Sequence, residues 1–229
     1  MLAWACMLSF GISSIIVLLL ALSVHESAHA WTADRLGDPT ARNLGRVSLN
    51  PLVHADLFGT FLIPLFLVLA QSPVVFGWAK PVPVDTRHLG SPKRDYMLVA
   101  GAGPASNLIM AAGLFAVLAL IKFSSPDGEL LVNQAARGVA GGYGFVGILA
   151  SMAYTGILIN LILAIFNLIP VAPLDGAAVL SGLLPDWLSR PLDSVQSFGF
   201  VFLIALLYFG VPNYVFIPVI NAVSRFLTL

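Results

Sequence analysis

Charged residues and cysteines are both scarce in this sequence. Asp, Glu, Lys and Arg make up only 10% of the 229 residues, whereas soluble proteins carry about 25%. Hydrophobic residues make up 59%, and the mean hydropathy is +0.94. This composition excludes an ordinary soluble domain and indicates an integral membrane protein. The net charge of zero, without a basic run, argues against nucleic acid as a partner, and the single Cys6 excludes an internal disulfide.

Five long stretches contain no charged residue and no histidine. Each is long enough to cross about 30 Å of hydrocarbon as a helix. We therefore predict an all-α polytopic membrane protein with about five to six transmembrane segments. The first stretch has no Lys or Arg before it and is longer than a signal-peptide core, so we expect a retained span. The uncharged stretches are residues 1–24, 57–79, 96–121, 138–174 and 194–224.

The segment around 57–85 needs a different arrangement from a simple crossing. Basic residues occur on both sides of it, in the connectors 35–46 and 80–94, and basic loops are typical of the cytoplasmic side. One crossing cannot begin and end on the same side. We therefore predict that residues 57–79 enter the membrane and return, and the alternating "PVPV" that follows suggests an extended chain. Such irregular backbone is tolerated at membrane depth only where protein or a water-filled cavity covers it.

The motif "HESAH" interrupts the end of the first apolar run. His25 and His29 are four residues apart and lie on one face of a helix, with Glu26 beside the first histidine. This spacing lets two imidazole nitrogens bind one Zn²⁺ while the glutamate acts as a base next to it. The alternative is a polar helix end whose histidines reach the water interface, but that leaves Glu26 unexplained as an ionisable group in a span.

A catalytic zinc needs a third protein ligand and an open fourth position. Glu129, the only other glutamate, lies in a polar loop without a supporting helical motif. Asp175 ends a long uncharged run, after Pro170 and Pro173, which break the helix, and before Gly176, which permits a tight turn. Taken alone, Asp175 is as well explained as the N-cap of a short helix. Beside the histidine motif, the ligand interpretation is favoured.

These motifs resemble the site-2 proteases, which are intramembrane zinc metalloproteases. The resemblance extends over residues 20–185 and is closest to the compact prokaryotic branch without PDZ or CBS domains. The family usually continues its Leu-Asp-Gly motif with a second glycine, whereas Ala177 follows here. The motifs that carry it are "HESAH" at 25–29, "LNPLVHADLFGT" at 49–60, "FGWAKPVPVD" at 76–85, "GPASN" at 103–107 and "NLIPVAPLDG" at 167–176.

The resemblance implies roles for particular residues. It implies that His25, His29 and Asp175 bind one Zn²⁺ and that Glu26 is the general base. Asn167 matches the asparagine that steadies the developing oxyanion in the family. From the residues alone, Asn167 is equally an amide at a helix end that pairs with freed carbonyls.

Two further polar residues stay open at this point. His54 is either an accessory proton donor or transient metal ligand, or a hydrogen-bonding residue of a polar loop. Asn107 is expected to tie the third span to the active-site region, because the small residues around it permit close helix packing. We expect this role to be structural rather than catalytic.

The predicted function is therefore hydrolysis of peptide bonds within or near transmembrane segments. The predicted unit is one transmembrane metalloprotease domain at 1–229, with a core at 8–185 and accessory C-terminal helices at 194–227. The expected partners are single-span or other membrane-protein substrates and the lipid bilayer of a prokaryotic cytoplasmic membrane, with the active site towards the cytoplasm. A membrane metal-ion transporter would need further ligands along its path. A catalytically silent relative that binds membrane segments would lack the base or a ligand.

Overall fold

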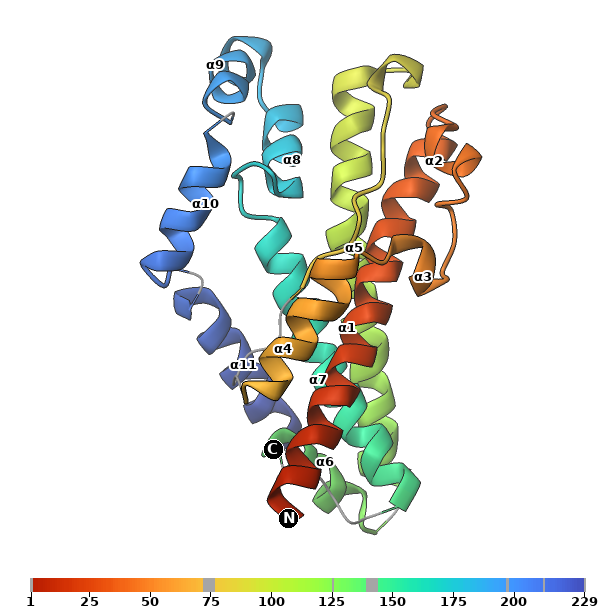
Figure 1. Ribbon diagram of the computed structural model, residues 1–229, viewed down its shortest axis with the longest axis vertical. Helices are drawn as coiled ribbons and strands as arrows, with labels where there is room; N and C mark the ends of the chain where they lie inside the picture. The colour runs from red at the N-terminus through yellow and green to blue at the C-terminus, as the bar shows by residue number, and fades with distance from the viewer. Residues whose placement is uncertain are drawn as a thin grey trace.

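The computed structural model describes residues 2–71, 77–124, 126–138, 144–196, 198–211 and 213–228, and these residues form helices and no strand. The all-α prediction is confirmed (Figure 1). The α-helices are α1 (Leu2–Arg35), α2 (Thr40–Asn43), α3 (Pro51–His54), α4 (Ile63–Leu69), α5 (Pro92–Ser124), α6 (Gly128–Ala136), α7 (Gly144–Asn167), α8 (Asp175–Leu183), α9 (Asp186–Gln196), α10 (Gly199–Tyr208) and α11 (Asn213–Thr228). A π-helix, η1 (Leu57–Leu62), precedes α4, and a 3₁₀-helix, η2 (Thr86–His88), precedes α5.

Three described helices are long and apolar enough to cross a membrane: Gly11–Arg35 of α1, then α5 and α7. The pair α10 and α11 makes a fourth span if the two helices, bent by 61°, are counted together. The sequence predicts about five to six segments. The described helices number fewer because the stretch 57–79 begins with short helices and the tail is broken at Gly210, whose φ is +68°.

The three long helices pack side by side, with α5 in contact with both α1 and α7 (Figure 1). In the half of the bundle that contains α6, these helices are held together by a hydrophobic cluster. It includes the fully buried Leu118 of α5, Val132 of α6 and Ile157 of α7. The opposite half of the molecule, away from α6, contains three helix ends: the C-terminal ends of α1 and α7 and the N-terminal end of α5 (Figure 1). This arrangement brings together polar motifs that are far apart in the sequence.

The segment after α3 turns back on itself, as the sequence predicts. η1 and α4 lead away, residues 72–76 lie outside the described part, and the chain then returns beside its own start. The N–H of Trp78 donates to the Gly59 carbonyl at 3.1 Å, and the Thr60 hydroxyl donates to the Trp78 carbonyl at 2.7 Å. A Cβ at Gly59 would lie 2.4 Å from the Trp78 ring, so the close return requires glycine there. Residues 77–85 have no regular secondary structure.

The chain also reverses direction between α7 and α8. As predicted from the prolines, α7 ends at Asn167, and a turn leads into α8. A Cβ at Gly176 would lie 2.3 Å from the Leu168 carbonyl oxygen. Glycine is therefore required for close backbone approach, and α8 is directed back against α5.

Candidate metal centre

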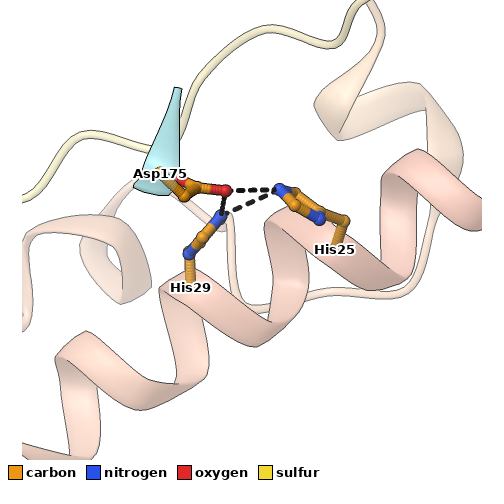
Figure 2. Close-up of side chains that lie close together, drawn as sticks. All are labelled: His25, His29 and Asp175. Atoms are coloured by element: carbon orange, nitrogen blue, oxygen red, sulfur yellow. Dashed lines mark hydrogen bonds and ion pairs between the residues drawn. The ribbon is translucent and has the colours of Figure 1, made fainter. Parts of the chain in front are cut away.

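Three side chains meet where α1 and α8 approach each other (Figure 2). His25 Nε2 and His29 Nε2 lie 3.1 and 3.4 Å from Asp175 Oδ2, and 3.0 Å from each other. One donor atom from each residue lies within 4.8 Å of the other two. The histidines are buried, and Asp175 is half-buried. Asp175 is the first residue of α8, and Leu174 occupies the N-cap position. The structure thus brings together the three residues that sequence analysis favoured as ligands.

A chain of buried amides fixes the proton on His25. Asn160 Nδ2 donates to the Gly156 carbonyl, so its Oδ1 accepts from Asn107 Nδ2 at 2.7 Å. Asn107 Nδ2 also lies 3.3 Å from the Ala21 carbonyl, so the Asn107 oxygen faces His25 Nδ1, at 2.6 Å. An acceptor at this position requires the proton on Nδ1 of a neutral imidazole. His25 Nε2 therefore presents a lone pair.

His29 is held in the same tautomer by a different partner. Its Nδ1 lies 2.7 Å from the Val99 carbonyl oxygen of α5, which accepts a proton and cannot donate one. His29 Nε2 therefore also presents a lone pair. Hydrogen bonds of this kind to the outer nitrogen are typical of histidines that bind metals, because they orient the ring and raise its basicity.

The donor set fits a divalent cation. When both rings are neutral, two imidazole lone pairs and a carboxylate oxygen converge, and a cation between them would balance these three acceptors. Asp175 Oδ2 is buried and makes no hydrogen bond of acceptable geometry within the described residues. Two imidazole nitrogens and one carboxylate are a ligand set of catalytic zinc sites, which leave a fourth position open.

Gly103 of the "GPASN" motif lets α5 approach the two histidines. A Cβ at this position would lie 2.4 Å from His29 Nε2 and 2.6 Å from His25 Cε1. A side chain here would therefore occupy the space in which the two rings converge. Close packing at this motif was predicted from its small residues, and at Gly103 the structure gives that packing a specific reason.

Glu26 lies on α1 between the two histidines in sequence, and it is half-buried. Its Oε2 accepts a hydrogen bond from the N–H of Val82, at 3.1 Å. The extended segment 77–85 therefore holds the carboxylate that sequence analysis assigned as the base. This backbone contact has no sequence signal beyond the "PVPV" pattern.

His54 and Asn167 lie outside the group of three ligands. His54 is buried, and its Nε2 lies 2.8 Å from the Ser48 carbonyl oxygen and 3.2 Å from Ser27 Oγ. It therefore joins the connector after α1 to the helix that carries the ligands. Asn167 Nδ2 donates to the Leu163 carbonyl at 3.0 Å, one turn back in α7. Accessory chemistry at His54 and oxyanion binding at Asn167 stay predictions.

Two features near the site were not predicted from the sequence: the hydrogen-bonding role of Asn160 and a cleft. Asn160 is fully buried in α7, and its signal is an amide side chain in the middle of a predominantly apolar helix. The cleft of about 730 Å³ begins beside Asp175, at Leu174 and Ala177. Tyr96 and Lys93, from the start of α5, also line this cleft.

The sequence matches the model of peptidase family M50 over residues 13–209. YwhC of Bacillus subtilis (strain 168), named as a candidate zinc metalloprotease, is 37% identical over 209 residues, which are 91% of this chain and 85% of YwhC. Rip2 of Mycolicibacterium smegmatis, named in the same way, is 28% identical over 82% of this chain and 64% of its own length. Rip2 of Mycobacterium tuberculosis (strain H37Rv) is 28% identical over 86% of this chain and 70% of its own length.

No solved structure matches this chain significantly. The family match covers residues 13–209, which contain both histidines, the aspartate and the "GPASN" motif of α5. A membrane-type helix bundle, a triad that could hold a metal ion and a family match over most of the sequence agree with one another. This chain belongs to peptidase family M50, the site-2 protease family of membrane metalloproteases.

Proposed function

We propose that this protein is a zinc-dependent endopeptidase that cleaves membrane proteins within or near their transmembrane segments. The observation that carries the proposal is the convergence of two imidazole rings and a half-buried carboxylate at the end of an apolar span. The donor set supports zinc, and the position within the helix bundle supports membrane-embedded substrates. His25, His29 and Asp175 would hold the ion.

Bound zinc supplies a Lewis acid that acidifies water and polarises a peptide carbonyl. Glu26 takes a proton from the attacking water as the new C–O bond forms, and it passes this proton to the leaving amine as the C–N bond breaks. The Val82 N–H holds one oxygen of Glu26 during these transfers. Asn167 would donate to the developing oxyanion after its amide leaves the Leu163 carbonyl.

A peptide bond in a substrate helix is shielded by its own hydrogen bonds, so the substrate must unwind locally and find new partners. We propose that the extended segment 77–85 pairs with the unwound substrate as an added strand. Three N–H groups of this segment donate hydrogen bonds to other parts of the chain. Trp78 donates to the Gly59 carbonyl, Lys80 to the His54 carbonyl and Val82 to the Glu26 carboxylate. In an extended chain, the carbonyls of Ala79 and Pro81 and the N–H of Ala79 would face the other way and pair with the substrate, whereas Pro81 has no N–H to donate.

We propose a cytoplasmic-membrane location with the site towards the cytoplasm. The arginines between residues 35 and 46 and the basic residues between 80 and 94 lie at the end of the bundle that carries the triad. Positive residues favour the cytoplasmic side. Substrates would be single-span or other membrane proteins.

The test is cleavage in liposomes of tagged single-span substrates by wild type and Glu26→Gln, with and without a zinc chelator. We expect cleavage within the substrate span, lost in the variant and after chelation. Glu129→Gln is the matched control, because Glu129 lies in α6 at the other end of the bundle and its loss should leave cleavage intact. Bound zinc without cleavage of any substrate would favour a binding role, and zinc flux across the liposome would favour a transporter.

A further inference from the structure

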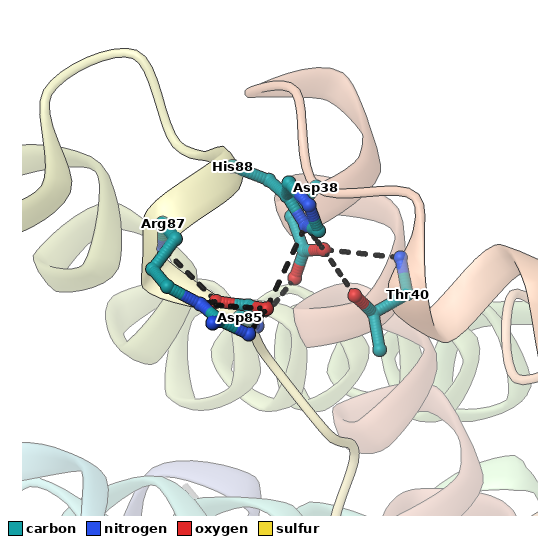
Figure 3. Close-up of polar contacts among 5 residues, drawn as sticks. All are labelled: Asp38, Thr40, Asp85, Arg87 and His88. Atoms are coloured by element: carbon teal, nitrogen blue, oxygen red, sulfur yellow. Dashed lines mark hydrogen bonds and ion pairs between the residues drawn. The ribbon is translucent and has the colours of Figure 1, made fainter.

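A second buried carboxylate, Asp38, lies three residues beyond the end of α1 and outside the metal centre. Its side chain is fully buried. Its Oδ2 accepts a hydrogen bond from the N–H of Asp85, at 2.7 Å. Its Oδ1 accepts from the N–H and hydroxyl of Thr40 and lies 3.3 Å from His88 Nδ1 (Figure 3). Asp38 therefore joins the end of α1 to the segment 85–88, which follows the extended chain.

The local backbone holds Asp38 rigidly against α1. The N–H of Asp38 donates to the Ala33 carbonyl at 2.9 Å, which closes the end of the helix. Gly37 adopts a φ of +109°, and a Cβ there would lie 2.9 Å from the His88 carbonyl oxygen. Glycine is thus required for the turn and for the close approach of segment 85–88. The position of Asp38, just beyond α1, is consequently fixed relative to Glu26 of α1.

The extended segment is bound to α1 and its C-terminal turn by two carboxylates. The N–H of Val82 donates to Glu26, and the N–H of Asp85 donates to Asp38. Only two residues separate these two N–H groups, and one of them, Pro83, has a fixed φ. A shift of Asp85 is therefore transmitted to Val82 and to the Glu26 carboxylate that Val82 holds.

We propose that Asp38 is a positioning residue of the protease: it anchors the C-terminal end of segment 77–85 so that the Val82 N–H orients Glu26. This proposal rests on the proposed function for its kinetic consequence, but the anchoring itself does not depend on activity. Asp38 makes no contact with the three ligands among its described interactions. Its loss should therefore affect the base and the substrate strand while zinc binding continues.

The kinetic test compares wild type, Asp38→Ala, Asp38→Asn and His88→Ala with the liposome substrates. A displaced catalytic group lowers turnover by about 100-fold for a shift near 1 Å, and we expect a kcat loss of this order in Asp38→Ala. Asp38→Asn keeps one acceptor and should lose less, and His88→Ala, which removes one exposed partner, should lose least. Zinc stoichiometry and the zinc dissociation constant should stay at wild-type values in all three variants.

Asp34→Asn is the matched control. Asp34 lies one turn before Asp38 and pairs with Arg42 rather than with the extended segment. Its loss should leave kcat close to wild type. A purely structural role for Asp38 would instead lower zinc affinity and kcat together.

Hydrogen–deuterium exchange on the zinc-loaded protein tests the anchor without any substrate. We expect peptides covering 77–88 to exchange faster in Asp38→Ala, with peptides covering His25, His29 and Asp175 unchanged. Wild-type exchange at 77–88 in this variant would overturn the proposal, as would wild-type kcat. If Asp38→Ala does not fold, Asp38→Asn and His88→Ala give the same readouts. If wild type cleaves nothing, the proposed function fails, and the exchange result alone decides whether Asp38 is the anchor.

Discussion

The candidate metal centre and the Asp38 cluster are both groups of polar side chains around α1 and its C-terminal turn, but they differ in where their protons lie. Around Asp38, each carboxylate oxygen faces N–H or O–H donors. Around Asp175, the carboxylate faces two imidazole nitrogens whose protons lie on the opposite side of each ring. A cluster with matched donors and acceptors is satisfied by its own hydrogen bonds, whereas three acceptors that face one another need a proton or a metal ion between them. The contrast distinguishes a structural cluster that is satisfied by its own hydrogen bonds from a candidate metal site.

Replacing a ligand should have the largest effect. Asp175→Ala removes one of three protein ligands, and we expect zinc stoichiometry to fall to near zero and cleavage to be abolished. Elemental analysis of the purified variant, together with the liposome assay, measures both. Asp186→Ala is the control, because Asp186 forms an exposed pair with Lys93. Stoichiometric zinc in Asp175→Ala would contradict the ligand assignment.

Gly103→Ala should have the next largest effect, because the added Cβ would lie within 2.6 Å of both imidazole rings. We expect a loss of zinc affinity of at least about 100-fold, the upper range for changes at groups that orient metal ligands. Chelator competition measures this affinity. Gly113→Ala, on the same helix, has no atom within 4 Å of the added Cβ and is the control. Unchanged affinity in Gly103→Ala would show that the rings can move aside.

Asn160→Leu tests whether the amide chain fixes the His25 tautomer. Loss of Asn160 removes one acceptor from Asn107 and lets that amide rotate, so His25 would no longer be held with its proton on Nδ1. We expect zinc affinity to fall by about 10-fold, as for other outer-shell partners of metal ligands. Nitrogen chemical shifts of His25 in the zinc-free protein report the tautomer. A wild-type tautomer population in the variant would count against this role.

The pH dependence of stability should give the smallest effect. Burial by itself would raise the pKa of Asp38, but the hydrogen bonds from Thr40 and Asp85 bring it below its ordinary value of 3.8. A folded-state pKa below the unfolded value means that this stabilisation is present above about pH 4 and is lost as pH falls through the folded-state pKa. Thermal unfolding curves of zinc-free wild type and Asp38→Asn should therefore begin to converge below about pH 4. Parallel curves down to pH 3 would show that Asp38 does not titrate in this way.

Local motifs were predictable because short-range geometry dictates them. The four-residue spacing of His25 and His29 places both on one helical face wherever that helix lies. The prolines before Asp175 end α7 whatever packs around them. The return of segment 57–85 followed from charge placement, since basic residues flank an apolar stretch. The number of spans was less predictable, because short apolar helices such as α4 have the same composition as parts of longer ones.

The sequence by itself determined the membrane class, the helical architecture, the histidine–glutamate motif and a short list of candidate third ligands. Tertiary structure decided that Asp175 meets both histidines, that Asn107 and Asn160 set a tautomer, and that Asp38 and Glu26 bind one extended segment. Composition and periodicity determine local structure, because they depend only on residues that are close together along the chain. Hydrogen bonds between distant segments depend instead on which helix faces meet, and packing of α1, α5 and α7 determines those faces.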